Sequence, residues 1–273
     1  MNQNKEDISK FISSLAPCCG GIRDVENGPL NEIGKLVTLS GIKNILPAVN
    51  SFCETIGLNF SEILKYDKVK NTNFSAKIKT IFDKHGSDKA LYHSYHLPYG
   101  EIFKDLNPSR KLNILEIGIG SNNPKIASFM SNYHTPGSSL RALKEIFPNS
   151  QIFGADLDKD ILFEEERIKT SFVDQLNASS FEEMHENFNK PKYDLIIEDG
   201  LHSIPASLNT LNFALKNTND NGVIVLEDLC NDYNIWAIIS SLLFIHGYNS
   251  QLITESTGLL LVIKNKPKRS KET

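Results

Sequence analysis

The sequence predicts an α/β fold with a doubly wound, mostly parallel sheet of seven strands, a C-terminal antiparallel hairpin and an N-terminal helical region. Three observations predict it. Residues 112–117 are nearly all apolar and run into a glycine turn, strand and helix patterns alternate from there onward, and a short turn at Ser256–Gly258 joins the last two strands. Strand–helix alternation indicates parallel strands with helices on both faces, whereas a short turn joins only antiparallel strands.

The expected strands are short apolar runs at the spacing of strand–helix units. Helical patterns separate most of them, for example Ser139 to Ile146 and Ala206 to Leu215. Apolar runs of this length between helices are typical of strands that are buried on both faces. The expected strands are residues 112–117, 151–156, 169–173, 193–198, 222–227, 249–254 and 258–264.

The chain is expected to contain four segments. Residues 1–75 have helical spacing with breaks and would form a cap or an oligomer contact. Residues 76–110 hold a tyrosine-rich stretch that either packs on the main domain or closes over a ligand as a lid. Residues 111–265 form the ligand-binding domain, and residues 266–273 form a basic tail that we expect to be solvated.

Composition argues against several classes of function. A net charge of −4, from 29 basic and 33 acidic residues, gives no dominant nucleic-acid footprint and leaves only a local basic patch as an alternative. No apolar run is long enough for a membrane span, and the polar N-terminus lacks a signal-peptide core. The cysteine spacing fits neither a disulfide framework nor a zinc site, so we expect reduced thiols and a cytoplasmic protein. The cysteines are Cys18, Cys19, Cys53 and Cys230.

The first strand ends in an acidic residue and two glycines. Gly118 and Gly120 fit a tight strand-to-helix turn that approaches a ligand, but Asn123 stands where a dinucleotide fingerprint has its third glycine. A carboxylate at Glu116 would repel a pyrophosphate and suits a ligand with a cationic centre, such as the amino-acid part of S-adenosylmethionine. The turn favours a methyltransferase over a dehydrogenase, with a glycine-rich turn of another doubly wound fold as the alternative.

Polar side chains also follow the second and third strands. Ligands of open α/β sheets bind beyond the carboxyl ends of the strands. Asp156 is placed to accept hydrogen bonds from both ribose hydroxyls, and Asp174 with Gln175 is placed to meet an adenine amino group. Each could instead be a loop residue or a helix N-cap. Their succession at consecutive strand ends favours an adenosyl group.

Three carboxylates follow the fourth and fifth strands, which we expect to be neighbours. Asp199, Glu227 and Asp228 would then meet at one edge of the sheet. Carboxylates that lie close together repel each other and raise each other's pKa. A bound divalent cation would relieve this repulsion. An all-oxygen ligand set suits Mg²⁺, with Mn²⁺ or Ca²⁺ as alternatives. In the alternative interpretation, only one or two of these carboxylates point inward and the others cap helices.

His202 lies three residues after Asp199, beside the expected cation and methyl donor. An alcohol is a poor nucleophile at neutral pH. Coordination to a cation lowers its pKa, and an imidazole can accept the proton. We therefore expect His202 to be a general base, although a lone histidine is more often structural.

Over residues 80–264, these motifs together resemble class I S-adenosylmethionine-dependent methyltransferases, specifically the metal-dependent sugar O-methyltransferases of macrolide tailoring. The resemblance implies that Asp199, Glu227 and Asp228 hold magnesium and that His202 is the base. The motifs that carry it are Gly86-Ser-Asp-Lys89 with Tyr92, His93, Tyr95 and Tyr99, Leu115-Glu-Ile-Gly118, Pro136-Gly-Ser-Ser-Leu-Arg141, Phe153-Gly-Ala-Asp156, Asp174-Gln175, Glu198-Asp-Gly-Leu-His202 and Glu227-Asp228.

The resemblance also implies roles for the remaining segments. Tyr92 and Tyr99 would help to bind the cofactor, the loop from Ser121 to Ser138 would line the acceptor pocket, and the protein would form a homo-oligomer. The expected acceptor is a small molecule with a sugar hydroxyl, and neither nucleic acid nor membrane is an expected partner. The alternatives are a catechol, a phosphate or phosphoramidate oxygen, an amine, or a non-catalytic module that binds the cofactor.

Overall fold

The computed structural model describes residues 71–126, 130, 135–229, 233–254 and 259–264, together with 55 and 64–65. The chain divides into two compact units, residues 1–59 and 60–273, and every element named below belongs to the second. Most of the expected N-terminal helical region, the four cysteines, the centre of the expected acceptor loop and the basic tail lie outside the described residues.

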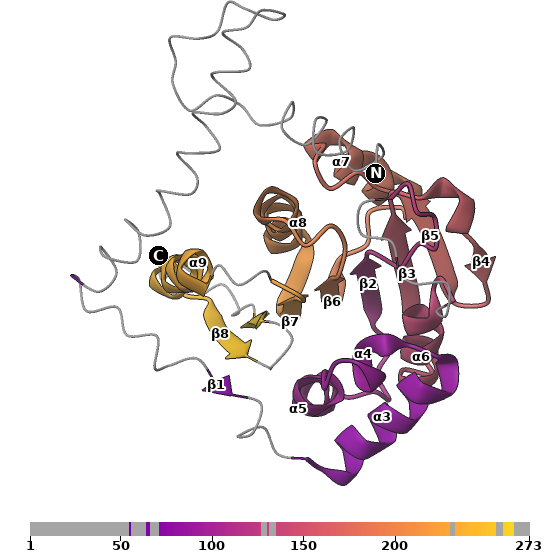
Figure 1. Cartoon of the computed structure of the whole chain (residues 1–273), viewed down its shortest axis with the longest axis horizontal. Helices are drawn as coiled ribbons and strands as arrows, with labels where there is room; N and C mark the ends of the chain where they lie inside the picture. The colour runs from indigo at the N-terminus through magenta and orange to yellow at the C-terminus, as the bar shows by residue number, and fades with distance from the viewer. Residues whose placement is uncertain are drawn as a thin grey trace, which may run out of the picture. The chain divides into compact units, whose positions relative to one another are not determined.

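A mixed sheet forms the centre of the second unit (Figure 1). Among the described residues it has nine strands in the order β1-β8-β9-β7-β6-β2-β3-β5-β4. The strands are β1 Leu64–Lys65, β2 Asn113–Ile117, β3 Gln151–Asp156, β4 Glu164–Glu165, β5 Ile168–Phe172, β6 Tyr193–Glu198, β7 Thr218–Leu226, β8 Asn249–Thr254 and β9 Leu259–Lys264.

The prediction of a doubly wound sheet that ends in an antiparallel hairpin is confirmed. β5, β3, β2, β6 and β7 pair in parallel, and β9 is antiparallel to both β7 and β8. The two strands beyond the seven expected ones, β1 and β4, have two residues each. A strand of two residues is too short to show a period in the sequence, so the pattern could not reveal them.

Helices cover both faces of the sheet (Figure 1). One buried cluster joins the sheet to α3, α5 and α6, and a second cluster on the other face joins it to α7, α8 and α9. No helix among the described residues combines the length and the apolar character needed to cross a membrane. The helices are α3 Asn73–His85, α4 Asp88–Leu91, α5 His96–Leu106, α6 Ser138–Ile146, the 3-10 helix η3 Lys159–Ile161, α7 Ala178–Asn187, α8 Ile204–Asn217 and α9 Tyr233–Ile245.

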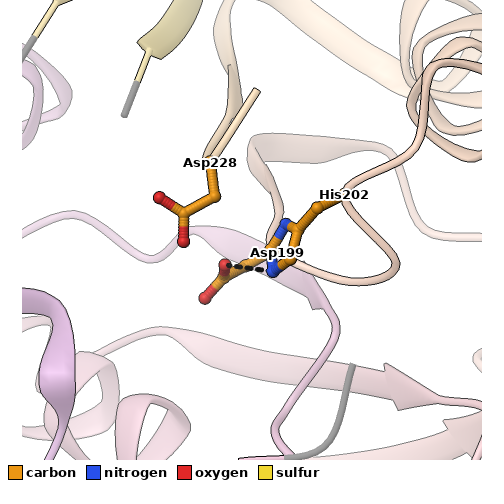
Figure 2. Close-up of side chains that lie close together, drawn as sticks. All are labelled: Asp199, His202 and Asp228. Carbon is orange, nitrogen blue, oxygen red and sulfur yellow. Dashed lines mark ion pairs between the residues drawn. The ribbon is translucent and has the colours of Figure 1, made fainter. Parts of the chain in front are cut away.

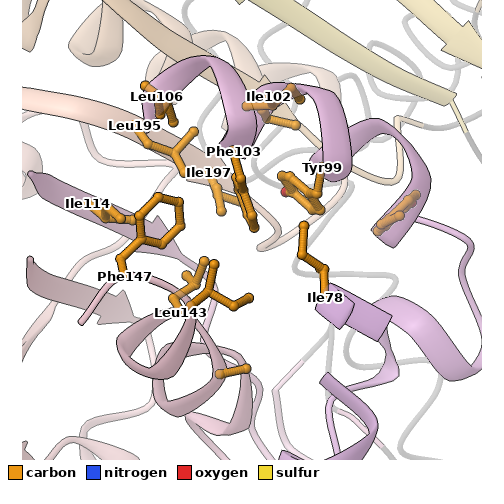
Figure 3. Close-up of a cluster of buried hydrophobic side chains, with 14 of the residues drawn as sticks. Ile78, Tyr99, Ile102, Phe103, Leu106, Ile114, Leu143, Phe147, Leu195 and Ile197 are labelled. Carbon is orange, nitrogen blue, oxygen red and sulfur yellow. The ribbon is translucent and has the colours of Figure 1, made fainter. Parts of the chain in front are cut away.

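The two clusters follow from the alternation of side chains along the strands. In β2, Ile114 belongs to the first cluster and Leu115 to the second, because successive residues of a strand point to opposite faces. In the first cluster, Phe103 of α5 meets Phe147 edge to face, with ring centroids 4.9 Å apart (Figure 3). This packing holds α5 against the sheet face that the first cluster covers.

Candidate active site

A cavity lies at the carboxyl ends of β2, β3, β5 and β6, where the sequence predicts a ligand. The turn after β2 forms one wall, and the loops after the other strands supply most of its polar groups. Of the residues predicted for the site, those that line the cavity are Gly118, Gly120, Asp156, Asp174, Gln175, Asp199, His202 and Asp228.

The two glycines of the first turn have positive φ angles, and the backbone that faces Gly118 leaves no room for a side chain. Gly118 has a φ of +87° and Gly120 a φ of +83°. A Cβ on Gly118 would lie 2.1 Å from the backbone oxygen of Asp199, and one on Gly120 would lie 2.2 Å from Cε of Met130. Glycine at position 118 therefore allows the loop after β6 to approach the first turn.

Glu116 is fully buried beneath the turn and does not line the cavity. Its carboxylate accepts a hydrogen bond of 2.7 Å from the hydroxyl of Ser139 and forms an ion pair of 3.1 Å with the ammonium of Lys89. Burial raises the pKa of Glu116, and the Lys89 charge opposes that rise. Ser139 and Lys89 themselves line the cavity, so they connect Glu116 to the ligand space.

Asp156 and Asp174 reach the cavity from the ends of β3 and β5. The Asp156 carboxylate accepts hydrogen bonds of 2.9 Å from the backbone N–H groups of Ile119 and Asp158. Asp174 accepts one of 2.9 Å from the N–H of Leu176. Both carboxylates therefore have fixed orientations and keep oxygen lone pairs for a ligand.

Gln175 links the third strand end to the loop that carries Asp199 and His202. Its amide nitrogen donates to Glu198 at 2.8 Å and to Thr210 at 2.9 Å, and its amide oxygen accepts from the N–H of Leu201 at 2.8 Å. Both amide protons are thereby used, which leaves the oxygen as the group that could meet a further donor.

Asp199, His202 and Asp228 converge at the carboxyl edge (Figure 2). β6 and β7 are paired with Glu198 opposite Leu226, so the residues that follow both strands lie side by side. One ligand atom from each of the three side chains lies within 4.8 Å of the others, and His202 Nε2 is 4.0 Å from Asp199 Oδ1. These three residues form the one group among the described residues that could hold a metal ion.

The backbone at this edge adopts an uncommon conformation at two of these positions. His202 has a φ of +52° and Asp228 a φ of +47°. Residues other than glycine rarely adopt positive φ, and such conformations persist where the surrounding structure enforces them. The backbone conformation therefore helps to orient both side chains, in addition to the contacts that they make.

The third predicted carboxylate, Glu227, lies behind this group. It is fully buried, does not line the cavity, and has both oxygens in hydrogen bonds, one from Lys89 at 2.5 Å and one from the hydroxyl of Tyr99. The structure therefore brings Asp199, His202 and Asp228 together as expected, but it buries Glu227 behind them, away from the cavity.

Lys89 is a residue of this site for which the sequence predicts no role. Its ammonium lies 2.6 Å from Asp199, 2.5 Å from Glu227 and 3.1 Å from Glu116, and its side chain is 2% exposed. Burial alone would lower the pKa of Lys89, but the three carboxylates together raise it well above its usual value. In the sequence, Lys89 stands out only as part of the Gly86–Lys89 motif, and this motif does not indicate which carboxylates would pair with its ammonium.

The three tyrosines of the expected lid have different surroundings. Tyr92 is 62% exposed, whereas Tyr95 and Tyr99 are buried, and none of the three lines the cavity. The Tyr95 hydroxyl donates to Asp228, as the Tyr99 hydroxyl does to Glu227. Burial, reinforced by nearby carboxylates, raises the pKa of both phenols, so both remain donors.

The donor set of the cavity fits a divalent cation that prefers oxygen. Carboxylate oxygens from Asp199 and Asp228 are the ligands that Mg²⁺ and Mn²⁺ take in proteins, usually with several waters. An imidazole suits softer metals better, so with Mg²⁺ the His202 side chain stays available for proton transfer. The glycine turn and the two oriented carboxylates of Asp156 and Asp174 fit a nucleoside-containing cofactor in the same cavity.

No protein-family model matches the chain. Curated proteins do match part of it. A 2'-O-methyltransferase of 8-demethyl-8-alpha-L-rhamnosyl tetracenomycin-C from Streptomyces olivaceus is 27% identical over 150 residues, which are 55% of this chain and 37% of that protein. The mycinamicin VI 2''-O-methyltransferase of Micromonospora griseorubida is 31% identical over 139 residues, which are 50% of this chain and 31% of that protein. The matches thus span about a third of these relatives.

Solved structures match the arrangement of the elements. The MycE methyltransferase from the mycinamycin biosynthetic pathway, in complex with Mg and SAH, superimposes with a TM-score of 0.56 at 19% identity, over 75% of this chain and 58% of that one. The chain has a methyltransferase fold. A second MycE structure, which also contains mycinamycin VI, has a TM-score of 0.55 at 18% identity, over 72% of this chain and 56% of that one.

Within the methyltransferase fold, the cavity occupies the carboxyl edge of the sheet, where open α/β sheets bind their ligands. The glycine turn, the oriented carboxylates and the Asp199–His202–Asp228 group all face that one cavity. A cofactor and an acceptor bound there would therefore lie beside the same candidate base and candidate metal ligands.

Proposed function

We propose that the protein is an S-adenosylmethionine-dependent, Mg²⁺-dependent O-methyltransferase that acts on a hydroxyl of a sugar or glycoside. The observation that carries this proposal is the convergence of Asp199, His202 and Asp228 in the cavity that the glycine turn also lines. The sugar O-methyltransferases among the curated relatives and the methyltransferase fold support it.

The cofactor site is assigned to the first three strand ends. Gly118 and Gly120 would let the backbone approach the amino-acid part of S-adenosylmethionine, and Asp156 would accept hydrogen bonds from its ribose. Asp174 and Gln175 would line the adenine end. Glu116 is buried beneath the turn and would contribute indirectly, through its contacts with Ser139 and Lys89. When bound, S-adenosylmethionine supplies the methyl group as an activated sulfonium.

The cation site is assigned to Asp199 and Asp228, with Glu227 as the buried third member of the acidic set. Asp199 and Glu227 share the ammonium of Lys89, which lies 2.6 Å from the first carboxylate and 2.5 Å from the second. When bound, Mg²⁺ lowers the pKa of an acceptor hydroxyl and orients it. The exposed Tyr92, predicted to help bind the cofactor, would contribute only from the cavity's surroundings.

His202 is assigned as the general base. Its imidazole lines the cavity, and its Nε2 lies 4.0 Å from Asp199 Oδ1. This carboxylate would stabilise the imidazolium that forms when His202 accepts the proton of the acceptor hydroxyl. Asp199, anchored by Lys89, and the Gln175-bound loop would hold the ring in place during that transfer.

The test is methyl transfer by the purified protein, measured by mass spectrometry as a CH₂ gain on a panel of glycosides and sugar nucleotides, with a catechol and an amine as alternative acceptors. We expect product from a glycoside or sugar nucleotide, and its loss in the presence of a chelator. Full turnover in chelator would contradict the metal role, and product from the catechol or the amine alone would contradict the sugar assignment.

Two substitutions separate the roles of the site residues. Asp199→Ala should abolish turnover and retain binding of SAH, and His202→Ala should lower kcat by about 10²–10⁴-fold. The matched controls are Asp220→Ala and His246→Ala, because both side chains are exposed and neither lines the cavity. If Asp199→Ala also lost SAH binding, the division between cofactor and cation sites would be wrong.

Three further expectations from the sequence stay predictions. They are the homo-oligomeric state, the cytoplasmic location and the absence of a nucleic-acid partner. Light scattering of the purified protein would test the first, and filter binding at low salt would test the last.

A further inference from the structure

Two buried tyrosines beside the candidate site have hydroxyls to which the proposed reaction gives no role. Tyr95 directly precedes α5 and Tyr99 lies in its first turn, so the two side chains project four residues apart from one face of the helix. Tyr95 donates to Asp228, and Tyr99 donates to Glu227. Two consecutive carboxylates after β7 thus each accept a hydrogen bond from a tyrosine hydroxyl on the same helix face.

The packing of both rings fixes where these hydroxyls lie. The Tyr99 ring stacks on Phe103 with centroids 4.6 Å apart and is tilted against Phe82 at 6.3 Å. The Tyr95 ring stacks on His93 at 4.7 Å and is 1% exposed. Neither hydroxyl can move far without disturbing the α5 side of the core, where Figure 3 shows Tyr99 next to Phe103.

A direct role in binding the cofactor fits these contacts poorly. Tyr99 reaches neither solvent nor cavity, because its side chain is completely buried and does not line the ligand space. Its hydroxyl is directed at Glu227, which is itself fully buried. The contacts of Tyr95 and Tyr99 lead to the acidic residues after β7 and not to the strand ends assigned to the adenosyl group.

We propose that Tyr95 and Tyr99 are positioning residues for the cation site. Tyr95 holds Asp228 in the orientation that binds a divalent cation, and Tyr99 fixes Glu227, which shares the ammonium of Lys89 with Asp199 and so helps to hold Asp199 in place. This inference rests on the metal dependence of the proposed function. Hydrogen-bond donors behind metal-binding carboxylates fix ligand orientation, and their removal typically weakens metal binding by about 10–100-fold. Helix α5 would thereby align two acidic residues of another segment, with one tyrosine for each.

The test removes single hydroxyls and measures two ligands separately. Tyr95→Phe and Tyr99→Phe keep the rings and their packing. Binding of Mn²⁺ is measured from the electron paramagnetic resonance signal of the free ion, and binding of SAH by calorimetry. Tyr193→Phe is the buried control, because the Tyr193 hydroxyl has no hydrogen-bond partner among the described residues.

We expect each of the two variants to bind Mn²⁺ about 10–100-fold more weakly than the wild type and to bind SAH within about threefold of it. The Tyr193→Phe control should match the wild type for both ligands. The inference is overturned if Mn²⁺ binding stays within threefold, if SAH binding falls while Mn²⁺ binding does not, or if both fall together, because none of these is a specific effect on the cation.

The wild type distinguishes failure of this inference from failure of the proposed function. If the wild-type protein binds SAH but no Mn²⁺, the metal dependence is wrong and the positioning role falls with it. If the wild type binds both ligands and the tyrosine variants also bind both normally, only the positioning role is wrong.

Discussion

At the scale of single residues, the site depends on a backbone approach that only glycine permits. The Cα of Gly118 faces the backbone oxygen of Asp199, and a Cβ would come within 2.1 Å of it. Replacing Gly118 with alanine must therefore move the loop that carries Asp199 and His202, in addition to the cost of placing a side chain at positive φ, which is about 1–2 kcal/mol.

We expect Gly118→Ala to weaken Mn²⁺ binding at least about tenfold, because a shift of Asp199 separates it from Asp228. The matched control is Gly86→Ala, since Gly86 has a φ of +72° but a Cβ added there would meet nothing within 4 Å. Both variants should lose stability, and only Gly118→Ala should lose the cation. Equal Mn²⁺ affinity in the two variants would show that the close approach does not matter.

A second prediction for a single residue concerns the dependence of stability on pH. Burial, aided by the positive charge of Lys79, lowers the pKa of His96 below its usual value of 6.5. The unfolded chain therefore binds the proton more readily than the folded chain. The contribution of His96 to stability is fully present above pH 6.5 and is lost as the pH falls from there through the folded-state pKa.

Urea denaturation at a series of pH values measures this contribution. The free energy of unfolding should fall less between pH 7 and 5.5 for His96→Gln than for the wild type. His246→Gln, at an exposed position, should follow the wild-type curve. Parallel curves for His96→Gln and the wild type would contradict the assigned pKa shift.

At the scale of elements, α5 connects the hydrophobic core to the candidate site. Phe103 is fully buried on this helix between Tyr99 and Phe147, whereas Glu101 is exposed on the same helix. Phe103→Ala should lower the free energy of unfolding by about 3–5 kcal/mol. Glu101→Ala should change it by less than about 0.5 kcal/mol, as measured by chemical denaturation. Similar losses in both would mean that α5 is not packed as described.

The sequence predicted the bounds of strands best where no turn-like residues interrupt the strand. β3, β6 and β8 have the expected bounds, Gln151–Asp156, Tyr193–Glu198 and Asn249–Thr254. β7 begins at Thr218 rather than at residue 222, because its first residues, with Asn221 at a φ of +64°, look like a turn in the sequence. The pairing of β6 with β7 is irregular at this point, which accommodates that turn-like stretch within the strand.

At the scale of the whole molecule, topology was easier to predict than charge pairing. The neighbouring ends of β6 and β7 followed from the order of strands and placed Asp199 near Asp228. The Lys89 ammonium among Asp199, Glu227 and Glu116 could not be predicted, because it joins residues up to 138 positions apart. Nor could the sequence show that Tyr99 faces Glu227, since that contact depends on how α5 packs on the sheet.

The central claim is that the Asp199 and Asp228 carboxylates hold a divalent cation beside a bound methyl-donor cofactor. The most direct measurement is a crystal structure of the protein with Mn²⁺ and SAH, in which anomalous scattering locates the metal. We predict a manganese peak within coordinating distance of both Asp199 and Asp228, with SAH along the Gly118–Gly120 turn. A structure with SAH bound there and no manganese between these carboxylates would contradict the claim.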